Sequence, residues 1–164
     1  MVASSYTLTV TTPSDREIVM TRTFDAPREL VFEALTKPEH MKEWWGPRGY
    51  TLPVCEIDFR PGGAYRFVSA DAEGNEYVFR GAYREIVPPE EIVWTFEFEG
   101  MPGMVSVDTM TLSEEDGKTT ITSTSVFDSV EHRDGMLESG METGAAESYD
   151  RLAELLEKLQ ENNS

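Results

Sequence analysis

Asp108 is the residue of this 164-residue sequence with the strongest case for a chemical role. Along residues 104–113 it has the same parity as Met104, Met110 and Leu112. Residues two apart on a strand face the same side of a sheet, so this spacing places the carboxyl among apolar neighbours. An isolated buried carboxyl is costly and often has a functional reason. Asp108 is therefore the candidate catalytic acid or base, whereas a β-bulge in this strand would turn it into solvent.

Hydroxyl groups on neighbouring predicted strands offer polar partners for this carboxyl. Ser123 and Ser125 share one parity near the end of the last predicted strand. With Asp108, and with Tyr83 or Tyr65 from earlier strands, they would form a cluster of polar anchors in an otherwise apolar cavity.

Two histidines are the only imidazole groups available for nucleophilic catalysis or metal binding. His40 and His132 fall on a short helix and near a helix start, and both are expected at the surface. His40 with Glu43, and His132 with Glu131 and Asp134, do not form a convincing ligand set. No phosphate-binding loop or dinucleotide glycine pattern is present. We therefore expect neither a metal nor a cofactor.

The charge balance excludes several partners. Fourteen basic and 31 acidic residues give a net charge of −17, which repels nucleic-acid phosphates and anionic lipid headgroups. No segment approaches the roughly 20 apolar residues of a membrane span. The single Cys55 cannot form an internal disulfide, and the first ten residues lack the regions of a signal peptide. These features predict a cytoplasmic protein without nucleic-acid or membrane partners, as a monomer or weak dimer.

The length favours one domain. We expect that domain over residues 16–160, preceded by a flexible segment or short extra strand over 1–15 and followed by a tail over 161–164. A strand over 16–24 precedes two short helices, which end near Gly46-Pro47. Turn signals then separate six strands over 51–59, 64–70, 76–87, 91–99, 104–113 and 118–128.

Connections this short exclude parallel crossovers, so the sheet is predicted to be antiparallel. One long amphipathic helix is expected from about 131 to 160, with Gly140 and Gly144 indicating close packing or a kink, or alternatively a ligand contact. The fold class is thus α+β: about seven antiparallel strands curve around a C-terminal helix.

Strand alternation predicts a concave apolar surface under that helix, which is either a ligand cavity or simply the core of a curved sheet. Trp44 and Trp45 point about 100° apart on a helix, so one can be buried while the other borders the mouth of a cavity. The candidate ligand-binding residues are Trp44, Trp45, Phe59, Tyr65, Phe67, Phe79, Tyr83, Trp94, Phe96, Met110, Ser123, Ser125, Met141, Ala145 and Tyr149.

Several motifs over residues 16–160 together resemble the SRPBCC superfamily, in particular its branch similar to the C-terminal domain of the activator of heat-shock protein 90 ATPase. They are FDAPRELVF (24–32), PEH (38–40), WWGP (44–47), RPGG (60–63), GAYREI (81–86), PPE (88–90) and GME (140–142). The resemblance implies the helix-grip fold of steroidogenic-acute-regulatory-related lipid-transfer domains and the birch-pollen allergen. Ala145 departs from the large side chain often found there in the family, and a smaller residue would enlarge a cavity.

The resemblance implies three functions. The first is binding of a hydrophobic small molecule, the second is docking on a chaperone to stimulate its ATPase, and the third is a cyclase, aromatase or hydratase reaction that uses Asp108. Residues 128–161 carry ten acidic and three basic side chains, a net charge of −7 that is expected mostly on the outward helix face. An acidic ligand would then enter poorly, because the pattern places no inward arginine beneath that helix.

Overall fold

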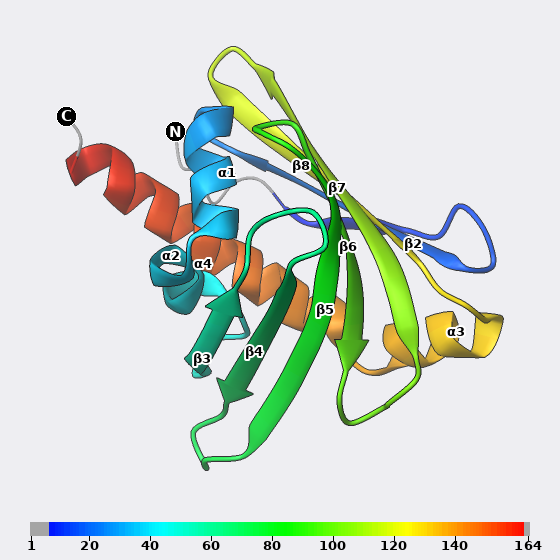
Figure 1. The fold of residues 1–164 in the computed structure, drawn as a ribbon. Coiled ribbons are helices and arrows are strands. Elements are labelled where there is room, and N and C mark those ends of the chain that lie inside the picture. Colours follow the sequence, from blue (N-terminus) through cyan, green and yellow to red (C-terminus); the bar gives the residue numbers. More distant parts are fainter. Residues whose placement is uncertain (1–6, 163–164) are drawn as a thin grey trace.

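A computed structural model describes residues 7–162 of the chain as one antiparallel sheet with four helices (Figure 1). The strand order is β1-β2-β8-β7-β6-β5-β4-β3, and every neighbouring pair is antiparallel. The strands are β1 (Thr9–Thr11), β2 (Glu17–Phe24), β3 (Thr51–Ile57), β4 (Ala64–Ala70), β5 (Glu76–Val87), β6 (Glu91–Phe98), β7 (Val105–Glu115) and β8 (Lys118–Val126). The helices are α1 (Arg28–Thr36), α2 (Pro38–Trp44), α3 (Val130–Glu138) and α4 (Met141–Asn162).

The antiparallel α+β architecture is confirmed, with eight strands in place of about seven. The additional strand is β1, which pairs with β2 and lies within the predicted 1–15 segment. Residues 1–6 and 163–164 of the two predicted terminal segments lie outside the described residues. The turn between β7 and β8 uses Asp116 and Gly117 at φ 55° and 77°, as a tight hairpin of twisted strands requires.

The expectation of a single helix over 131–160 is wrong, because the chain forms two helices there. Gly140 has a φ of +86°, a left-handed conformation that ends a helix and that glycine adopts without steric cost. It separates α3 from α4, and α4 continues to Asn162. A Cβ atom at Gly144 would lie 3.5 Å from the Pro47 side chain, so this face of α4 is close to the loop after α2.

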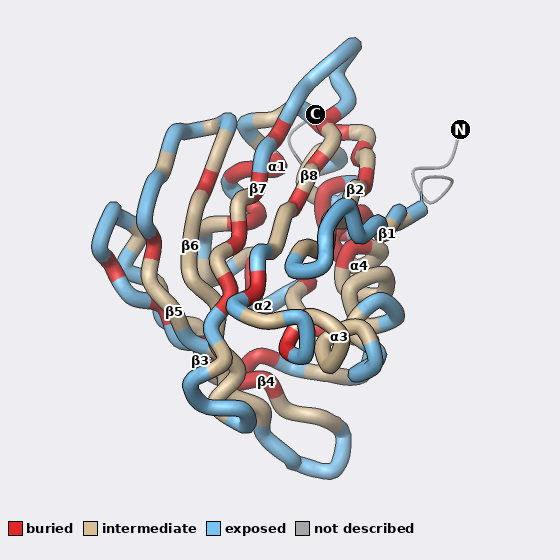
Figure 2. The backbone as a smooth tube through the Cα atoms, turned by 90° about the vertical axis from the view of Figure 1, so that its right-hand side faces the viewer, coloured by how far each residue is buried: buried red, intermediate tan, exposed pale blue. Residues whose placement is uncertain are grey.

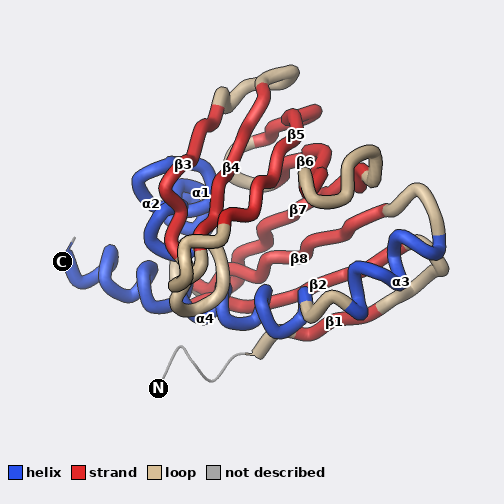
Figure 3. The backbone as a smooth tube through the Cα atoms, turned by 90° about the horizontal axis from the view of Figure 1, so that it is seen from below, coloured by secondary structure: helices blue, strands red, loops and turns tan. Residues whose placement is uncertain are grey.

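The core forms where α1, α2 and α4 pack against the concave side of the sheet (Figure 3). The burial pattern in Figure 2 follows strand alternation, with buried and more exposed residues taking turns along β7 and β8. Val31 of α1 and Leu152 of α4 are both fully buried in this core. The single C-terminal helix α4 therefore contributes to the core together with the two short helices that precede β3.

Candidate functional site

Half-buried aromatic rings lie on the concave face of β5 and β6 and at the end of α2. The ring centroid of Phe79 lies 4.9 Å from Trp45, 5.5 Å from Phe96 and 5.2 Å from Phe98. Trp94 lies two residues before Phe96 on the same face of β6. We call these five half-buried residues the aromatic strip: Trp45, Phe79, Trp94, Phe96 and Phe98.

A second aromatic group lies on the same face and is more deeply buried. The ring of Tyr83 is 5.5 Å from Tyr65 and 5.1 Å from Phe59. The Tyr65 hydroxyl donates a hydrogen bond to the main-chain carbonyl of Thr95 at 2.6 Å. Burial raises the pKa of both tyrosines, so their hydroxyls stay protonated near neutral pH.

Gly81 makes the Tyr65 contact possible. A Cβ atom on Gly81 would lie 1.9 Å from the carbonyl oxygen of Thr95 and 2.8 Å from the Tyr65 ring. Only a residue without a side chain fits at this point of β5, where Tyr65 reaches across from β4 to β6. The sequence pattern identified the GAYREI segment but not this reason for its glycine.

One of the two adjacent tryptophans is buried and the other is not, but helix geometry is not the reason: α2 ends at Trp44, and Trp45 has an extended backbone conformation. Trp44 is buried, donates from Nε1 to the carbonyl of Ala34 at 2.8 Å and stacks on Tyr149 with ring centroids 6.2 Å apart. Trp45 is only half-buried and contacts Phe67 with ring centroids 5.2 Å apart. The structure thus joins Trp44 to α4 and Trp45 to the sheet.

Asp108 is buried, with 8% of its surface exposed. β7 pairs with both neighbours without a register shift, so the alternative of a bulge that turns Asp108 into solvent is wrong. Its Oδ1 accepts a hydrogen bond from Ser106 Oγ at 3.0 Å, and Ser125 lies opposite on β8. Burial raises the pKa of Asp108 to about 6, and hydrogen bonds from the two serines act in the opposite direction.

The remaining predicted residues are less closely associated with this carboxyl. Ser123 lies opposite Met110 across β8 and β7, and both are buried. Met141 and Ala145 are half-buried in the first turns of α4. Tyr149 is close enough to Asp108 that the carboxylate contributes to the raised pKa of the phenol, after burial. The structure therefore brings Asp108 together with Ser125 and places Ser123 further along β8.

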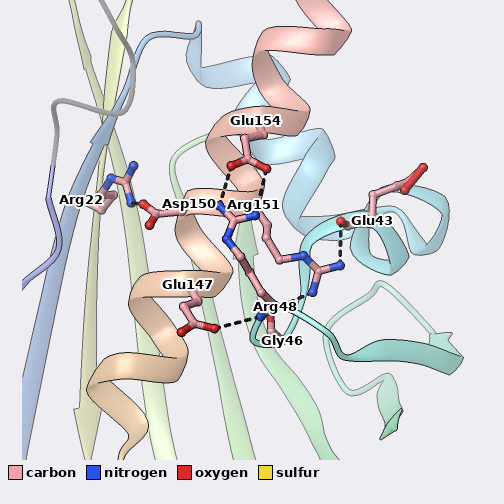
Figure 4. Close-up of polar contacts among 8 residues, drawn as sticks. All are labelled: Arg22, Glu43, Gly46, Arg48, Glu147, Asp150, Arg151 and Glu154. Carbon is pink, nitrogen blue, oxygen red and sulfur yellow. Dashed lines mark hydrogen bonds and ion pairs between the residues drawn. The ribbon is translucent and has the colours of Figure 1, made fainter. Parts of the chain in front are cut away.

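Arg22 is an inward arginine that the sequence analysis missed. Its side chain is 1% exposed, and its Nη1 lies 2.8 Å from Asp150 Oδ1 of α4 (Figure 4). The guanidinium carbon lies 5.1 Å from the centre of the Phe24 ring, and Nε and Nη2 have no hydrogen-bond partner among the described atoms. Arg22 shares its parity with Ile18 and Phe24, and this signal was present in the sequence.

Carboxylates and one arginine of α4 also hold the loop after α2 (Figure 4). The Arg48 main-chain N donates to Glu147 at 3.0 Å and its guanidinium to Glu154 at 3.2 Å. Arg151 donates to the carbonyl of Gly46 at 2.9 Å and to the carbonyls of Pro47 and Glu43 at 3.1 Å. Glu147, Asp150 and Glu154 thus use part of the acidic face to fix α4 to the loop and to β2.

His132 is not the surface residue that the sequence analysis expected. It is 3% exposed, its Nδ1 lies 3.2 Å from Asp128 Oδ1, and its ring packs edge-on against Phe127 at 4.8 Å. Its main-chain N donates to the helix-capping Ser129 Oγ at 3.0 Å. His132 is thus a packed residue at the start of α3, whereas His40 is half-buried in α2.

Within residues 7–162, no three histidine, cysteine, aspartate or glutamate side chains are grouped so that they could hold a metal. Two open depressions, of about 450 and 480 Å³, have none of the five residues of the aromatic strip in their lining. One lies by Arg28, Glu90 and Glu114, and the other by Glu56, Arg66 and Arg80. The strip itself consists of rings packed against one another.

A curved, unclosed antiparallel sheet that packs against a long C-terminal helix defines a helix-grip protein. A family model described as "Activator of Hsp90 ATPase homolog 1-like protein" matches residues 25–157. The chain belongs to this family, within the SRPBCC superfamily.

Solved bacterial structures share the fold. A protein from Nitrosomonas europaea is 25% identical, with a TM-score of 0.82 over 91% of this chain and 99% of that one. A Staphylococcus epidermidis protein is 29% identical, with a TM-score of 0.73 over 92% and 94%. A Rhodobacter sphaeroides protein, 24% identical, has a TM-score of 0.87 over 93% and 99%. No curated protein matches. Among the described helices, none has the length and apolar character needed to cross a membrane.

Proposed function

We propose that this protein binds a small apolar or aromatic molecule on the aromatic strip, between the sheet and α4. The observation that carries this proposal is the incomplete burial of five large rings on the same face as the core. Covering apolar surface yields roughly 25 cal/mol per Å², so about 100 Å² of newly covered ring surface would contribute about 2.5 kcal/mol to binding. Membership in the family is consistent with ligand binding.

A ligand screen with two matched variants tests this proposal. Thermal shift and native mass spectrometry would be measured with fatty acids, isoprenoids and aromatic polyketides. Phe96→Ala removes a ring from the strip, whereas Val93→Ala shortens a half-buried side chain of β6 on the opposite face. We expect a ligand that stabilises the wild type and Val93→Ala but loses about tenfold in affinity for Phe96→Ala, equivalent to about 1.4 kcal/mol. If no ligand of these classes binds, the proposal fails.

A second candidate function is activation of a chaperone ATPase, which the description of the matching family supports. This function would use the outer surface of the domain and would not need the aromatic strip. The ATPase rate of heat-shock protein 90 would be measured with and without the protein. An increase that Phe96→Ala leaves intact supports this candidate, and an unchanged rate rejects it.

A third candidate is a cyclase, aromatase or hydratase reaction, favoured by the buried Asp108 carboxyl beside the strip. A carboxyl with a pKa near 6 can exchange a proton near neutral pH. Asp108→Asn would then abolish turnover and leave binding of an uncharged substrate unchanged. Turnover that persists in this variant excludes Asp108 as the proton-transfer group.

A further inference from the structure

Asp108 is a buried carboxyl without a cationic partner among the described residues. Its hydrogen-bond donors are the hydroxyls of Ser106 and Ser125, and no basic side chain is paired with it. Arg22, the buried guanidinium of β2, is paired with Asp150 instead. Buried carboxylates are rare unless a cation or several hydrogen bonds compensate for the loss of water. The charge of Asp108 is therefore only partly compensated by the protein itself.

This carboxyl lies directly beside the aromatic strip. Across the β6–β7 ladder, Asp108 is opposite Trp94, and Ser106 is opposite Phe96. Opposed residues of an antiparallel pair have Cβ atoms about 4.5–5.5 Å apart. Asp108 is buried while Trp94 is half-buried, so the indole is the more exposed member of this pair on the concave face.

The other polar groups around Asp108 carry no compensating positive charge. Tyr65 of β4 and Tyr149 of α4 lie within its electrostatic range, and burial keeps both phenols neutral. The charge of Arg22 acts to lower the pKa of Tyr149, but the Arg22 side chain remains bound to Asp150. The polar and aromatic groups around the Asp108 carboxylate are therefore hydroxyl groups and aromatic rings, without a cation.

A carboxylate next to an indole is a combination that recognises a cation. The faces of aromatic rings attract ammonium groups, and most strongly those of tryptophan. The carboxylate would provide a charge-assisted hydrogen bond. The net charge of −17 also raises the local concentration of cations around the whole molecule and lowers that of anions.

We infer that the ligand on the aromatic strip is an aromatic or apolar amine, whose ammonium group binds between Asp108 and Trp94 while its apolar body lies along Phe96 and Phe79. This inference rests on the proposed binding function and specifies its ligand class. The competing site for a charged group is Arg22, whose free Nε and Nη2 suit a carboxylate. Arg22 is 1% exposed and already engaged by Asp150 and Phe24, so we favour Asp108.

The test uses three probes with one aromatic body and different end groups: naphthylethylamine, naphthylethanol and naphthylacetate. Affinities would be measured by fluorescence titration at neutral pH for the wild type, Asp108→Asn and Glu56→Gln. Glu56 is an exposed carboxylate of β3, so Glu56→Gln changes the net charge equally without touching the site. A hydrogen bond to a charged group is worth about 1.5–3 kcal/mol, which predicts a preference of about 10- to 100-fold for the amine over the alcohol.

We expect Asp108→Asn to abolish this preference, with less than about threefold change for the alcohol, and Glu56→Gln to retain it. A wild type that binds all three probes equally, or naphthylacetate best, overturns the inference and leaves the proposed binding function standing. Binding of none of the probes overturns the inference, and the screen with fatty acids, isoprenoids and aromatic polyketides then decides on the binding function. If Asp108→Asn does not fold, the wild type decides: acidification to about pH 5 protonates most of Asp108 and should lower the amine preference about tenfold while sparing alcohol binding, and a preference that stays unchanged at pH 5 also overturns the inference.

Discussion

The two halves of α4 cover the concave face of the sheet to different extents. In the second half, Leu152 and Leu156 are 0% and 2% exposed, in one core with Phe24 and Ile121. In the first half, Met141 and Ala145 remain half-buried. Residues of the same chemical type and on the same face of the molecule thus differ in burial. We expect the well-covered part of the face to contribute most to stability, whereas the rings of the aromatic strip stay partly exposed.

Shortening one side chain in each half of α4 should show this difference most strongly. Leu152→Ala would leave a cavity in a tightly packed core and lower the free energy of unfolding by about 3 kcal/mol. Met141→Ala should lower it by less than about 1 kcal/mol, because that side chain is only half covered. Urea unfolding of both variants measures the two values. Equal losses would mean that both halves of α4 contribute alike to the core.

Gly81→Ala tests whether β5 and β6, which carry most of the aromatic strip, are rigid at this position. Gly81→Ala would place a Cβ atom 1.9 Å from the carbonyl oxygen of Thr95, which is backbone and cannot move away freely. We expect a loss of about 2–3 kcal/mol in the free energy of unfolding, as for other overpacked sites. Gly135→Ala in α3 is the control, because its Cβ meets open space and should stabilise the helix by about 0.5–1 kcal/mol. A tolerated Gly81→Ala would show that β5 and β6 can separate at this point.

Asp108 should make the protein less stable at neutral pH than in acid. Its pKa is raised to about 6 in the folded state from 3.8, so the folded protein binds the proton more tightly than the unfolded chain. This contribution therefore increases stability as the pH falls from about 6 to about 4 and decreases it as the pH rises. A shift of about two pKa units is worth about 3 kcal/mol, so Asp108→Asn should stabilise the protein by up to about 3 kcal/mol at pH values well above 6, and this gain should disappear below about pH 4.

Urea unfolding of Asp108→Asn and of the wild type across this pH range provides the measurement. The exposed Glu76→Gln of β5 is the control and should change stability by less than about 0.5 kcal/mol at each pH. A stability difference between Asp108→Asn and the wild type that does not depend on pH would show that the carboxyl is already compensated in the folded protein.

Alternation along the strands predicted much of this arrangement. Spacing to Met110 and Leu112 predicted an inward Asp108 and left a β-bulge as the alternative. The structure decides between them, because β7 has no bulge there. Helix boundaries were less accessible, since the apolar stripe continues through Gly140 and only its positive φ separates α3 from α4. Sequence periodicity indicates which face a residue takes but not where the backbone changes direction.

Contacts between distant elements were the part that the sequence did not reveal. The pair Arg22–Asp150 joins residues 128 positions apart, and either charge alone is typical of a solvent-exposed residue. The Tyr65 bond to Thr95 depends on the absence of a side chain at Gly81, one strand away. Such contacts depend on how the sheet and α4 approach each other, which local patterns do not encode.

The smallest predicted effect concerns Arg22 and Asp150, the ion pair that joins β2 to the middle of α4. Asp150→Asn removes the anion that faces a guanidinium of 1% exposure, but Asp150 itself is 48% exposed and solvent compensates part of the loss. We expect a decrease of about 1 kcal/mol in the free energy of unfolding, less than for a fully buried pair.

Adding Arg22→Met should restore this stability, because the variant then has no unpaired buried charge and gains an apolar contact with Phe24. Urea unfolding of the single and double variants checks both values, with Glu157→Gln on the exposed side of α4 as a control for charge. If Asp150→Asn is neutral, Arg22 is held in place by Phe24 and the surrounding core, and the ion pair does not contribute to the free energy of unfolding.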